Sequence, residues 1–402
     1  MSELRDRLHD LDRLEVPDVF DRAQRLGPKT PMDIEPGPGP AKRVAIAAFA
    51  LLLAVVTIVY ATRAFDRQIR PAPATPTPQP STTCAWTKTT LAIPLLAKHR
   101  SATRLVAGTS RDDLWVMGSK NPWIDQVLMH YDGEAWSRVR LPADLVNIFS
   151  GDMAAPAPND LWLLTSNGVA RFDGSTWSRT TFPGLGGLDS TASGLLDLEV
   201  VSPDDAWATG SVYDASTQTW GPVLFHWDGI TWSDIDARSV GVGEDFGLVA
   251  ISAWAPDDVW VAGMTSEDRR GRPLALHWDG TAWTVRKAHG RPSSADGFGL
   301  VATGPDEALM TVMKGVLSWT GGTWVDTGFQ APTSMDVPLS MGRGATGDVW
   351  AKVWNTNVAR WDGESWDQRS LKPFYSYGLT TIDGSAVFAG AKDGGAVRIY
   401  DC

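Results

Sequence analysis

The chain has 402 residues, of which 43% are hydrophobic and 21% are charged, so it can bury a large core, and its length alone suggests two or three ordinary domains. The formal net charge of -11 argues against nucleic-acid binding, which usually requires a basic surface. Its 39 glycines and 26 prolines are typical of a turn-rich all-β protein, and all 20 tryptophans follow residue 85.

The first 43 residues are predicted to form a cytoplasmic tail. Leu4, Leu8 and Leu11 recur at helical spacing, and a second apolar group lies between residues 20 and 26. Two short amphipathic helices over residues 2–26 would suit a cytoplasmic protein partner. In its general pattern this stretch resembles the tails of actinobacterial single-pass proteins, some of them linked with extracytoplasmic-function sigma factors. Disorder or loose membrane association is the alternative.

Residues 44–62, VAIAAFALLLAVVTIVYAT, contain no charged side chain. As a helix this run would be about 28 Å long, close to the thickness of the hydrocarbon core, and we interpret it as a transmembrane helix. A buried core helix is an alternative, but such a helix rarely stays uncharged over this length. A cleaved signal peptide is disfavoured by the long lead-in and by the lack of a small-x-small site before Arg63.

Basic residues flank both ends of this run, so the positive-inside rule does not decide the orientation. Residues 63–83 form a Pro/Thr-rich, semi-rigid linker. The only two cysteines, Cys84 and Cys402, bracket the remaining chain, a placement that favours pairing in an oxidising compartment. We therefore expect a single-pass protein of the cell membrane with a cytoplasmic N-terminus and an extracytoplasmic body at residues 84–402.

The body is built from a repeat. The stretch LALHWDGTAWTVR, residues 274–286, returns as MHYDGEAW, ARFDGSTW, FHWDGITW, LSWTGGTW and ARWDGESW. The aromatic residue after the turn recurs at intervals of roughly 40 to 55 residues, the period of propeller blades. These residues are Trp86, Trp136, Trp177, Trp232, Trp283, Trp324 and Trp366.

Each period predicts four strands. In the fourth complete period they are GLVAISAW, VWVAG, LALHW and TAWTVR, joined by a tight APDD turn, a longer loop and the Asp-Gly turn. Asp-Gly permits the positive φ of a two-residue hairpin turn. A four-stranded sheet cannot bury both faces alone, and a ring of sheets gives each one two neighbours, with the recurring aromatics filling the wedge between them.

Six periods are complete, and the seventh is split between the chain ends. GLTTIDGSAVFAGAKDGGAVRIYDC supplies three strands, and CAWTKTTLA supplies the fourth. Aligned on HWDGTAW, Tyr400 and Trp86 take the two aromatic positions, and Cys84 and Cys402 take adjacent positions of the missing turn, which predicts a disulfide. The predicted fold is an all-β, seven-bladed β-propeller of four-stranded blades, preceded by one transmembrane helix and a short helical or disordered tail.

Residues 84–402 resemble bacterial propellers with repeated PDDxWxxG and WDGxxW motifs, and are distantly similar to sialidase-type Asp-box and kelch propellers. The resemblance implies the fold and no particular activity. The Gly-His dipeptide of WD40 repeats is missing, and the Asp and Gly of the turn are adjacent instead of spaced as in the Asp box. No arginine triad with a nucleophilic tyrosine is found.

The histidines His130, His226 and His277 occupy one equivalent position on the third strands of three blades. They would be too far apart to share an ion, so no metal site is predicted. Calcium at the Pro-Asp turns is an alternative, but these turns have ordinary type I chemistry. No P-loop, GxSxG or HExxH motif is present, and no cofactor is predicted.

Four tryptophans have no repeated position: Trp123, Trp220, Trp254 and Trp354. The loops between second and third strands, and those joining blades, should share one face, with the tight turns on the opposite face. Aromatic and charged side chains on such loops are typical of binding sites, although solvated loops are the alternative. The predicted ligand-binding residues are Trp123, Tyr213, Trp220, Arg269 and Arg270.

These features favour a membrane-tethered extracytoplasmic recognition module that binds a glycan, an envelope component or a protein and signals through its tail. The first alternative is a glycan-cleaving propeller enzyme, which would need carboxylates or a Tyr-Arg set converging near the axis. The second is a structural envelope scaffold. Clustered acids at the mouth of the ring would favour the enzyme, and aromatics would favour the binding module.

Overall fold

The structure is a computed structural model. It describes residues 86–94, 103–121, 124–145, 150–165, 167–182, 185, 194–240, 242, 245–265, 271–289, 299–313, 315–331, 338–344, 346–354, 356–372, 375–391 and 395–401. The chain divides into two units, Met1–Thr77 and Pro78–Cys402, and all described residues belong to the second. The predicted tail, transmembrane helix and linker lie outside the described residues. Among those described, no helix is long and apolar enough to span a bilayer.

The second unit consists of seven four-stranded antiparallel sheets, which we call blades I to VII. Blade I contains β2 (Thr103–Ser110), β3 (Asp113–Asn121), β4 (Ile124–Tyr131) and β5 (Trp136–Val139). Blade II contains β6 (Ser150–Ala157), β7 (Asp160–Thr165), β8 (Gly168–Phe172) and β9 (Trp177–Thr181). Blade III contains β10 (Gly194–Ser202), β11 (Asp205–Asp214), β12 (Thr219–Trp227) and β13 (Trp232–Asp234). The short 3-10 helix η1 (Ala237–Val240) follows β13.

The remaining blades have the same order. Blade IV contains β14 (Phe246–Ala255), β15 (Asp258–Thr265), β16 (Arg272–Trp278) and β17 (Trp283–Lys287). Blade V contains β18 (Leu300–Gly304), β19 (Glu307–Val312), β20 (Gly315–Thr320) and β21 (Thr323–Asp326). Blade VI contains β22 (Pro338–Arg343), β23 (Val349–Val353), β24 (Asn357–Trp361) and β25 (Trp366–Ser370). Blade VII contains β26 (Tyr375–Ile382), β27 (Ser385–Ala391), β28 (Gly395–Asp401) and β1 (Thr87–Ala92).

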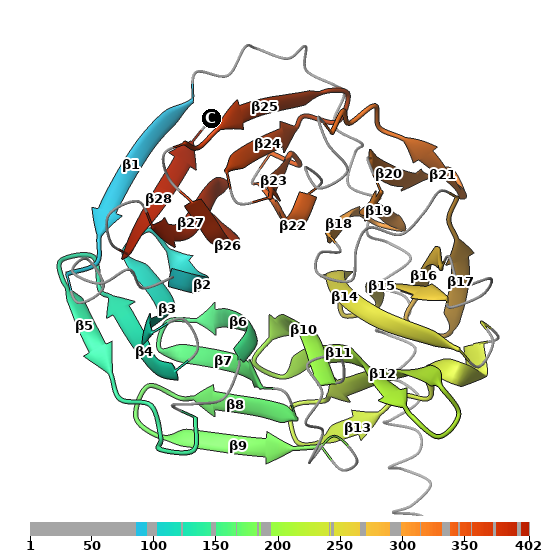
Figure 1. Cartoon of the computed structure of the whole chain (residues 1–402), viewed down its shortest axis with the longest axis horizontal. Coiled ribbons are helices and arrows are strands. Elements are labelled where there is room, and N and C mark those ends of the chain that lie inside the picture. The colour runs from blue at the N-terminus through green and yellow to red at the C-terminus, as the bar shows by residue number, and fades with distance from the viewer. Residues whose placement is uncertain are drawn as a thin grey trace, which may run out of the picture. The chain divides into compact units, whose positions relative to one another are not determined.

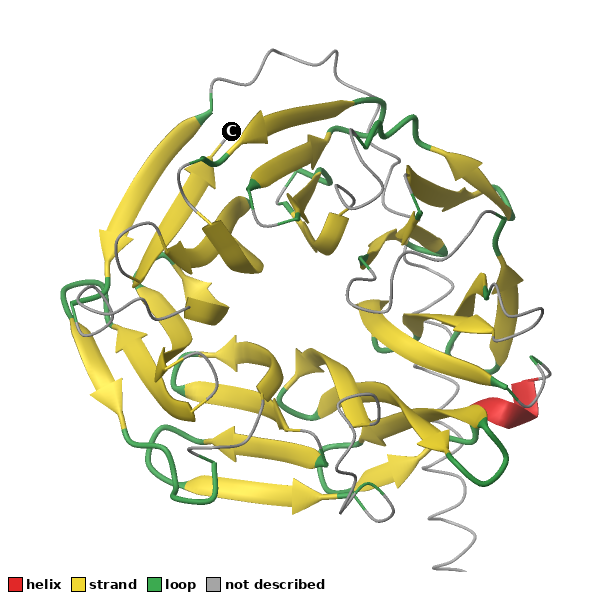
Figure 2. Ribbon diagram, viewed as in Figure 1, coloured by secondary structure: helices red, strands yellow, loops and turns green. Residues whose placement is uncertain are grey.

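The blades form a closed ring around an axis (Figure 1). The first strand of each blade is innermost and contacts the first strands of both neighbouring blades, including β2 against β26 where the ring closes. Figure 2 shows strands in every blade and η1 at the rim. The predicted seven-bladed propeller with four-stranded blades is confirmed.

Ring closure depends on pairing between the chain ends, as predicted. The N-terminal strand β1 is the outer strand of blade VII and pairs antiparallel with β28. The register differs from the sequence alignment by two residues, because Tyr400 lies opposite Lys88 and Thr87 lies opposite Asp401. A shift of two residues keeps every side chain on its expected face, so Trp86 still packs against Tyr400, at 6.3 Å between ring centroids.

The Asp-Gly turns need glycine for two reasons. Gly229 has a φ of 93°, in the left-handed region that favours glycine. A Cβ at Gly229 would also lie only 3.2 Å from the Cβ of Asp204, in the neighbouring Pro-Asp turn. The carboxylate of Asp228 accepts hydrogen bonds from the backbone N–H groups of Ile230 and Thr231, which closes the turn.

The repeated tryptophans pack between blades, as predicted. Trp260 of blade IV is fully buried, and its ring centroid lies 6.0 Å from those of Trp319 and Trp324 in blade V. The corresponding contact between blades VI and VII joins Trp350 and Trp86 at 4.8 Å. Each ring fills the space where two twisted sheets diverge toward the rim, so it contributes its large apolar surface to two blades at once.

Candidate functional site

The antiparallel order of each blade sends its two kinds of connection to opposite faces of the ring. Connections between second and third strands, and between blades, lie on what we call the long-loop face, and the Pro-Asp and Asp-Gly turns lie on the tight-turn face. Of the five predicted ligand-binding residues, Tyr213 and Trp220 fall within the described chain. Trp123, Arg269 and Arg270 lie outside it.

The structure brings Tyr213 and Trp220 together at the long-loop end of the β11–β12 hairpin. They are direct partners across the two strands, and their ring centroids lie 5.2 Å apart at an interplanar angle of 52°. The outer strand β13 pairs only with Phe225–Trp227 of β12, so the hairpin extends beyond its neighbour in the sheet. Tyr213 is 38% exposed, unlike the repeated tryptophans of the blade interfaces.

The extended part of β12 is protected against strand addition. The N–H of Trp220 donates to Asp245 at 2.8 Å, Pro222 has no N–H, and the carbonyl oxygen of Leu224 accepts from Ile235 at 2.9 Å. Because these backbone groups are already used or missing, the hairpin offers its aromatic side chains, and not its backbone edge, to a ligand.

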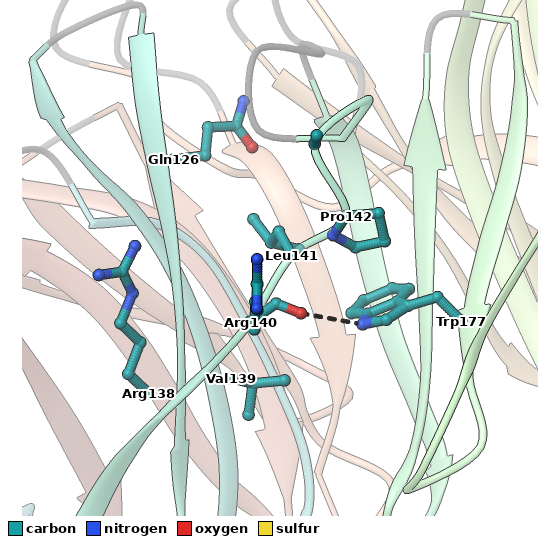
Figure 3. Close-up of a pocket in the computed structure, with 8 residues that line it drawn as sticks. Gln126, Arg138, Val139, Arg140, Leu141, Pro142 and Trp177 are labelled. Carbon is teal, nitrogen blue, oxygen red and sulfur yellow. Dashed lines mark hydrogen bonds between the residues drawn. The ribbon is translucent and has the colours of Figure 1, made fainter.

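A depression lies between the outer strands of blades I and II, at the long-loop end of β5 (Figure 3). Its volume is about 500 Å³, and one wall is the indole ring of Trp177, whose Nε1 donates to the carbonyl oxygen of Arg140 at 3.2 Å. The lining residues are Gln126, Arg138, Val139, Arg140, Leu141, Pro142, Ala143 and Trp177.

The two other tryptophans without a repeated position are also partly exposed. Trp354, 37% exposed, lies between β23 and β24 on the long-loop face and has a φ of 50°, which is uncommon for a bulky residue and marks local backbone strain. Trp254, 39% exposed, lies near the tight-turn end of the inner strand β14. Neither packs in the way that the repeated tryptophans do.

A cluster near the axis joins blades that are not neighbours. The guanidinium carbon of Arg343, at the end of β22 in blade VI, lies 4.8 Å from the ring centroid of Trp254 in blade IV. Arg343 also interacts electrostatically with Glu199 of β10 in blade III. The sequence pattern did not single out Glu199 or Arg343, and the only signal was that Trp254 has no place in the repeat.

Two partly buried carboxyl groups on inner strands link adjacent blades. Asp152 of blade II accepts the N–H of Leu198 in blade III at 3.2 Å, and Asp197 of blade III accepts the N–H of Ile251 in blade IV at 2.8 Å. Burial raises the pKa of both carboxyl groups, and the nearby charge of Asp197 raises that of Asp152 further. Their hydrogen bonds assign them a role in joining inner strands.

Glu199 makes a similar link with the N–H of Ala253 in blade IV. Burial raises the pKa of Glu199 to about 7, and the charge of Arg343 only partly opposes that rise. This carboxyl group therefore changes its charge near neutral pH at the point where three blades meet.

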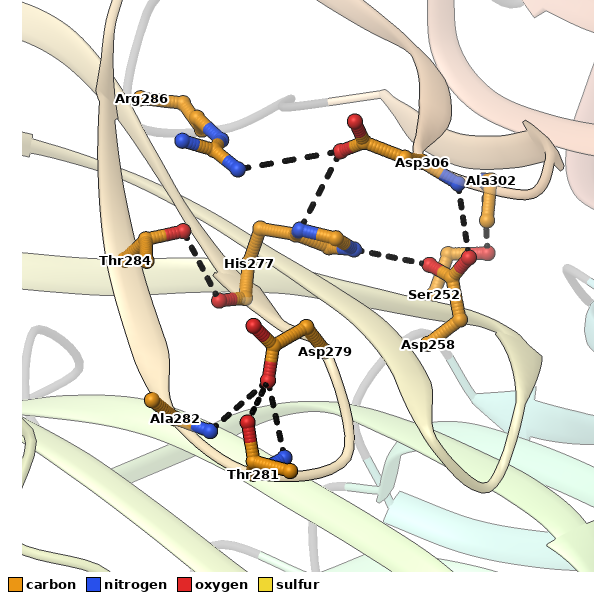
Figure 4. A network of polar contacts seen from close by, with 10 residues as sticks. All are labelled: Ser252, Asp258, His277, Asp279, Thr281, Ala282, Thr284, Arg286, Ala302 and Asp306. Atoms are coloured by element: carbon orange, nitrogen blue, oxygen red, sulfur yellow. Dashed lines mark hydrogen bonds and ion pairs between the residues drawn. The ribbon is translucent and has the colours of Figure 1, made fainter. Parts of the chain in front are cut away.

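The repeated histidines belong to structural networks in their own blades, and the network of His277 also reaches the next blade. His277 places Nε2 at 2.9 Å from Asp258, its ring stacks on Trp260 at 4.2 Å, and Nδ1 lies 3.3 Å from Asp306 of blade V (Figure 4). His130 and His226 contact Asp113 and Asp205 in the same way. In blades II and VI an arginine takes the place of the histidine, and the ion pairs are Arg171–Asp160 and Arg360–Asp348.

The described residues include no group of three or more His, Cys, Asp or Glu side chains that could hold a metal ion. Each repeated histidine is committed to the carboxylate of its own blade, with one ring nitrogen in a direct contact and the ring face against a tryptophan. In blades I, III and IV the aspartate at the start of the second strand, which looked like turn chemistry in the sequence, is the partner that orients the histidine.

No protein-family model and no curated protein matches this chain. Among solved structures, it is similar to a catalytically inactive virginiamycin B lyase from Staphylococcus aureus with quinupristin, at 13% identity and a TM-score of 0.56, covering 78% of this chain and 99% of that one. It is also similar to YCF48 bound to D1 peptide, at 14% identity and a TM-score of 0.53, covering 78% and 95%.

A third similar structure is the extracellular domain of a putative hybrid two-component system from B. thetaiotaomicron, at 12% identity and a TM-score of 0.54. That match covers 78% of this chain and 39% of the other. At these identities the likenesses show a shared propeller fold, which occurs in extracellular domains and in a peptide-bound protein.

Glu199→Gln tests the titration near the axis. The folded pKa of about 7 exceeds the ordinary value of 4.5, so the contribution of Glu199 to stability is fully present below pH 4.5 and is lost as the pH rises to 7. The loss is at most about 3 kcal/mol, and partial exposure reduces it. Denaturation at several pH values measures the free energy of unfolding. As the pH rises over this range, this free energy should fall for the wild type relative to that of Glu199→Gln. The exposed control Glu134→Gln should show the same pH dependence of stability as the wild type. If the curve of stability against pH for Glu199→Gln also runs parallel to that of the wild type, the raised pKa of Glu199 is contradicted.

Asp205→Ala tests the histidine networks. The substitution leaves the ring nitrogen of His226, 3.0 Å away, without its carboxylate partner, so the free energy of unfolding should fall by about 1–3 kcal/mol. The adjacent Asp204→Ala is a matched control, because its carboxylate is exposed and the Cβ that packs on Gly229 is retained. Chemical denaturation measures both, and equal losses would show that the network does not stabilise the blade.

Proposed function

We propose that this chain is a membrane-tethered extracytoplasmic recognition module that binds a glycan, an envelope component or a protein on its long-loop face and signals through residues 2–26. The observation that carries the proposal is the Tyr213–Trp220 pair. Two adjacent aromatic rings at the end of an extended hairpin have little core to fill, and such rings offer flat apolar surfaces to sugar rings or partner side chains. Trp123, Arg269 and Arg270, which the sequence predicts on the same face, remain candidates.

The path of the chain agrees with this arrangement. Since β1 runs antiparallel to β28, and Thr87 lies opposite Asp401, the chain enters the ring at the tight-turn face. The described part of the chain therefore begins at the tight-turn face, and the long-loop face lies at the other end of the blades. The fold shared with an extracellular domain of a putative two-component system and with peptide-bound YCF48 supports a binding role for such a ring.

Binding is favoured over glycan cleavage by the surroundings of the inner carboxyl groups. Among the described residues, Asp152, Asp197 and Glu199 are acids near the axis, and each accepts a backbone N–H of the next blade. A general acid or nucleophile needs a carboxyl group that can reach the substrate, whereas these three hold strands together. The aromatic pair is partly exposed at the end of its hairpin, where a ligand can reach it.

Export of the body predicts a Cys84–Cys402 disulfide, which lies outside the described residues. It would join the two chain ends beside the β1–β28 pair and could stabilise the ring by up to about 5 kcal/mol. Peptide mapping of the membrane-purified protein without reductant should find the linked cysteines, and protease added to intact cells without an outer barrier should remove the body. Two free thiols, or a body protected until lysis, would reject this topology.

The double substitution Tyr213→Ala/Trp220→Ala tests the binding face. Because both rings are at least partly exposed, the melting temperature should change little, whereas binding to an envelope fraction should weaken by about tenfold, or about 1.4 kcal/mol. Ile230→Ala is a control, since Ile230 is 82% exposed on the tight-turn face. A collapse of the fold would show that the pair is packing, and unchanged binding would remove it from the site.

A further inference from the structure

The depression between blades I and II is suited in size to one small cyclic group. Its volume of about 500 Å³ lies within the usual range for ligand sites. Val139, Leu141 and Pro142 supply apolar walls, and Trp177 of the next blade supplies an aromatic one (Figure 3). This site is distinct from the Tyr213–Trp220 pair, which lies in blade III.

The walls of the depression are preformed. Leu141 is buried in the core between blades I and II, and Trp177 packs against the same core. The bond from Trp177 Nε1 to the carbonyl oxygen of Arg140 fixes the ring, and the bond from Leu145 N–H to the carbonyl oxygen of Pro142, at 2.9 Å, fixes the turn that follows β5. A ligand would therefore not have to order these walls.

The charge of the depression is opposite to that of the chain. Arg138 and Arg140 are exposed, and within the described residues neither has a carboxylate partner, whereas nearby Arg179 lies 3.1 Å from Asp144. The protein as a whole carries a net charge of -11. Within the described residues neither guanidinium group has a carboxylate counter-ion, which favours an anion, and their planar donors match the two oxygens of a carboxylate.

We propose that this depression binds a hexuronic acid residue of an acidic glycan. The C–H face of the sugar ring packs on Trp177 and the aliphatic walls, and the carboxylate meets Arg138 and Arg140. Gln126 at the rim carries both a donor and an acceptor, which suits hydroxyl groups. An acidic peptide fits less well, because the Arg140 carbonyl oxygen that could pair with its backbone already accepts the indole N–H.

Calorimetric titration of the full-length protein in detergent with a galacturonic acid trisaccharide tests the proposal. The acidic trisaccharide should bind, the neutral galactose trisaccharide should bind at least about tenfold more weakly, and high salt should weaken the acidic one. Arg138→Gln/Arg140→Gln should lower its affinity by about tenfold or more. The matched control Arg179→Gln, which removes an arginine outside the lining, should bind like the wild type.

A second pair of variants separates charge from geometry. Arg138→Lys/Arg140→Lys keeps both charges but loses the planar fork, so its affinity should fall between those of the wild type and the Gln variant. A melting temperature equal to that of the wild type shows that each variant is folded. The Tyr213→Ala/Trp220→Ala protein should bind the trisaccharide normally, so a failure of one site is distinguishable from a failure of the other.

Four outcomes would overturn the proposal. The first two are that the acidic trisaccharide does not bind, or that the neutral trisaccharide binds as tightly as the acidic one. The third is that the folded Arg138→Gln/Arg140→Gln protein binds the acidic trisaccharide with wild-type affinity. The fourth is that triglutamate binds as tightly as the acidic trisaccharide or more tightly. The last would assign the depression to an acidic peptide.

Discussion

A four-stranded sheet has two apolar faces and two edges, and it cannot satisfy any of them alone. In this protein the ring supplies a neighbour for each face, and large aromatics such as Trp260 and Trp350 fill the divergent space between sheets. The closure of blade VII by β1 and β28 completes the arrangement. Every other feature of the molecule, including which surfaces are available for binding, depends on this mutual burial.

The inner edges impose a second constraint, because each first strand carries backbone N–H groups that its own sheet leaves unpaired. Asp152 and Asp197 accept such groups from the next blade, and Ser252 accepts the N–H of Ala302 in the same manner. Partly buried carboxyl groups in a propeller would otherwise suggest acid–base chemistry. Their hydrogen bonds show instead that these carboxyl groups join neighbouring blades, and Glu199 and Arg343 extend the link across the ring.

Because repeated positions are committed to packing, turns and blade-to-blade bonds, specificity has to come from residues that interrupt the repeat. The β11–β12 hairpin is an example, since it outgrows its outer strand and carries Tyr213 and Trp220. The strained, exposed Trp354 is another. A rigid scaffold with a few irregular features on one face is an arrangement that binds ligands without large conformational change.

The sequence predicted the blade number, the four-strand pattern, the split seventh blade and the packing role of the repeated tryptophans. It could do so because turn chemistry and the period of apolar residues are local signals. The register of β1 against β28 differs by two residues from the one that the sequence alignment predicted. No local signal sets the pairing of distant strands, and a shift of two residues leaves each side chain on the same face of the sheet. Only the tertiary structure decided three other features. They are the pairing of Asp258 with His277, the contact of Arg343 with Trp254 and the depression at Trp177. Each depends on distances between different strands or blades, which arise only when the ring closes.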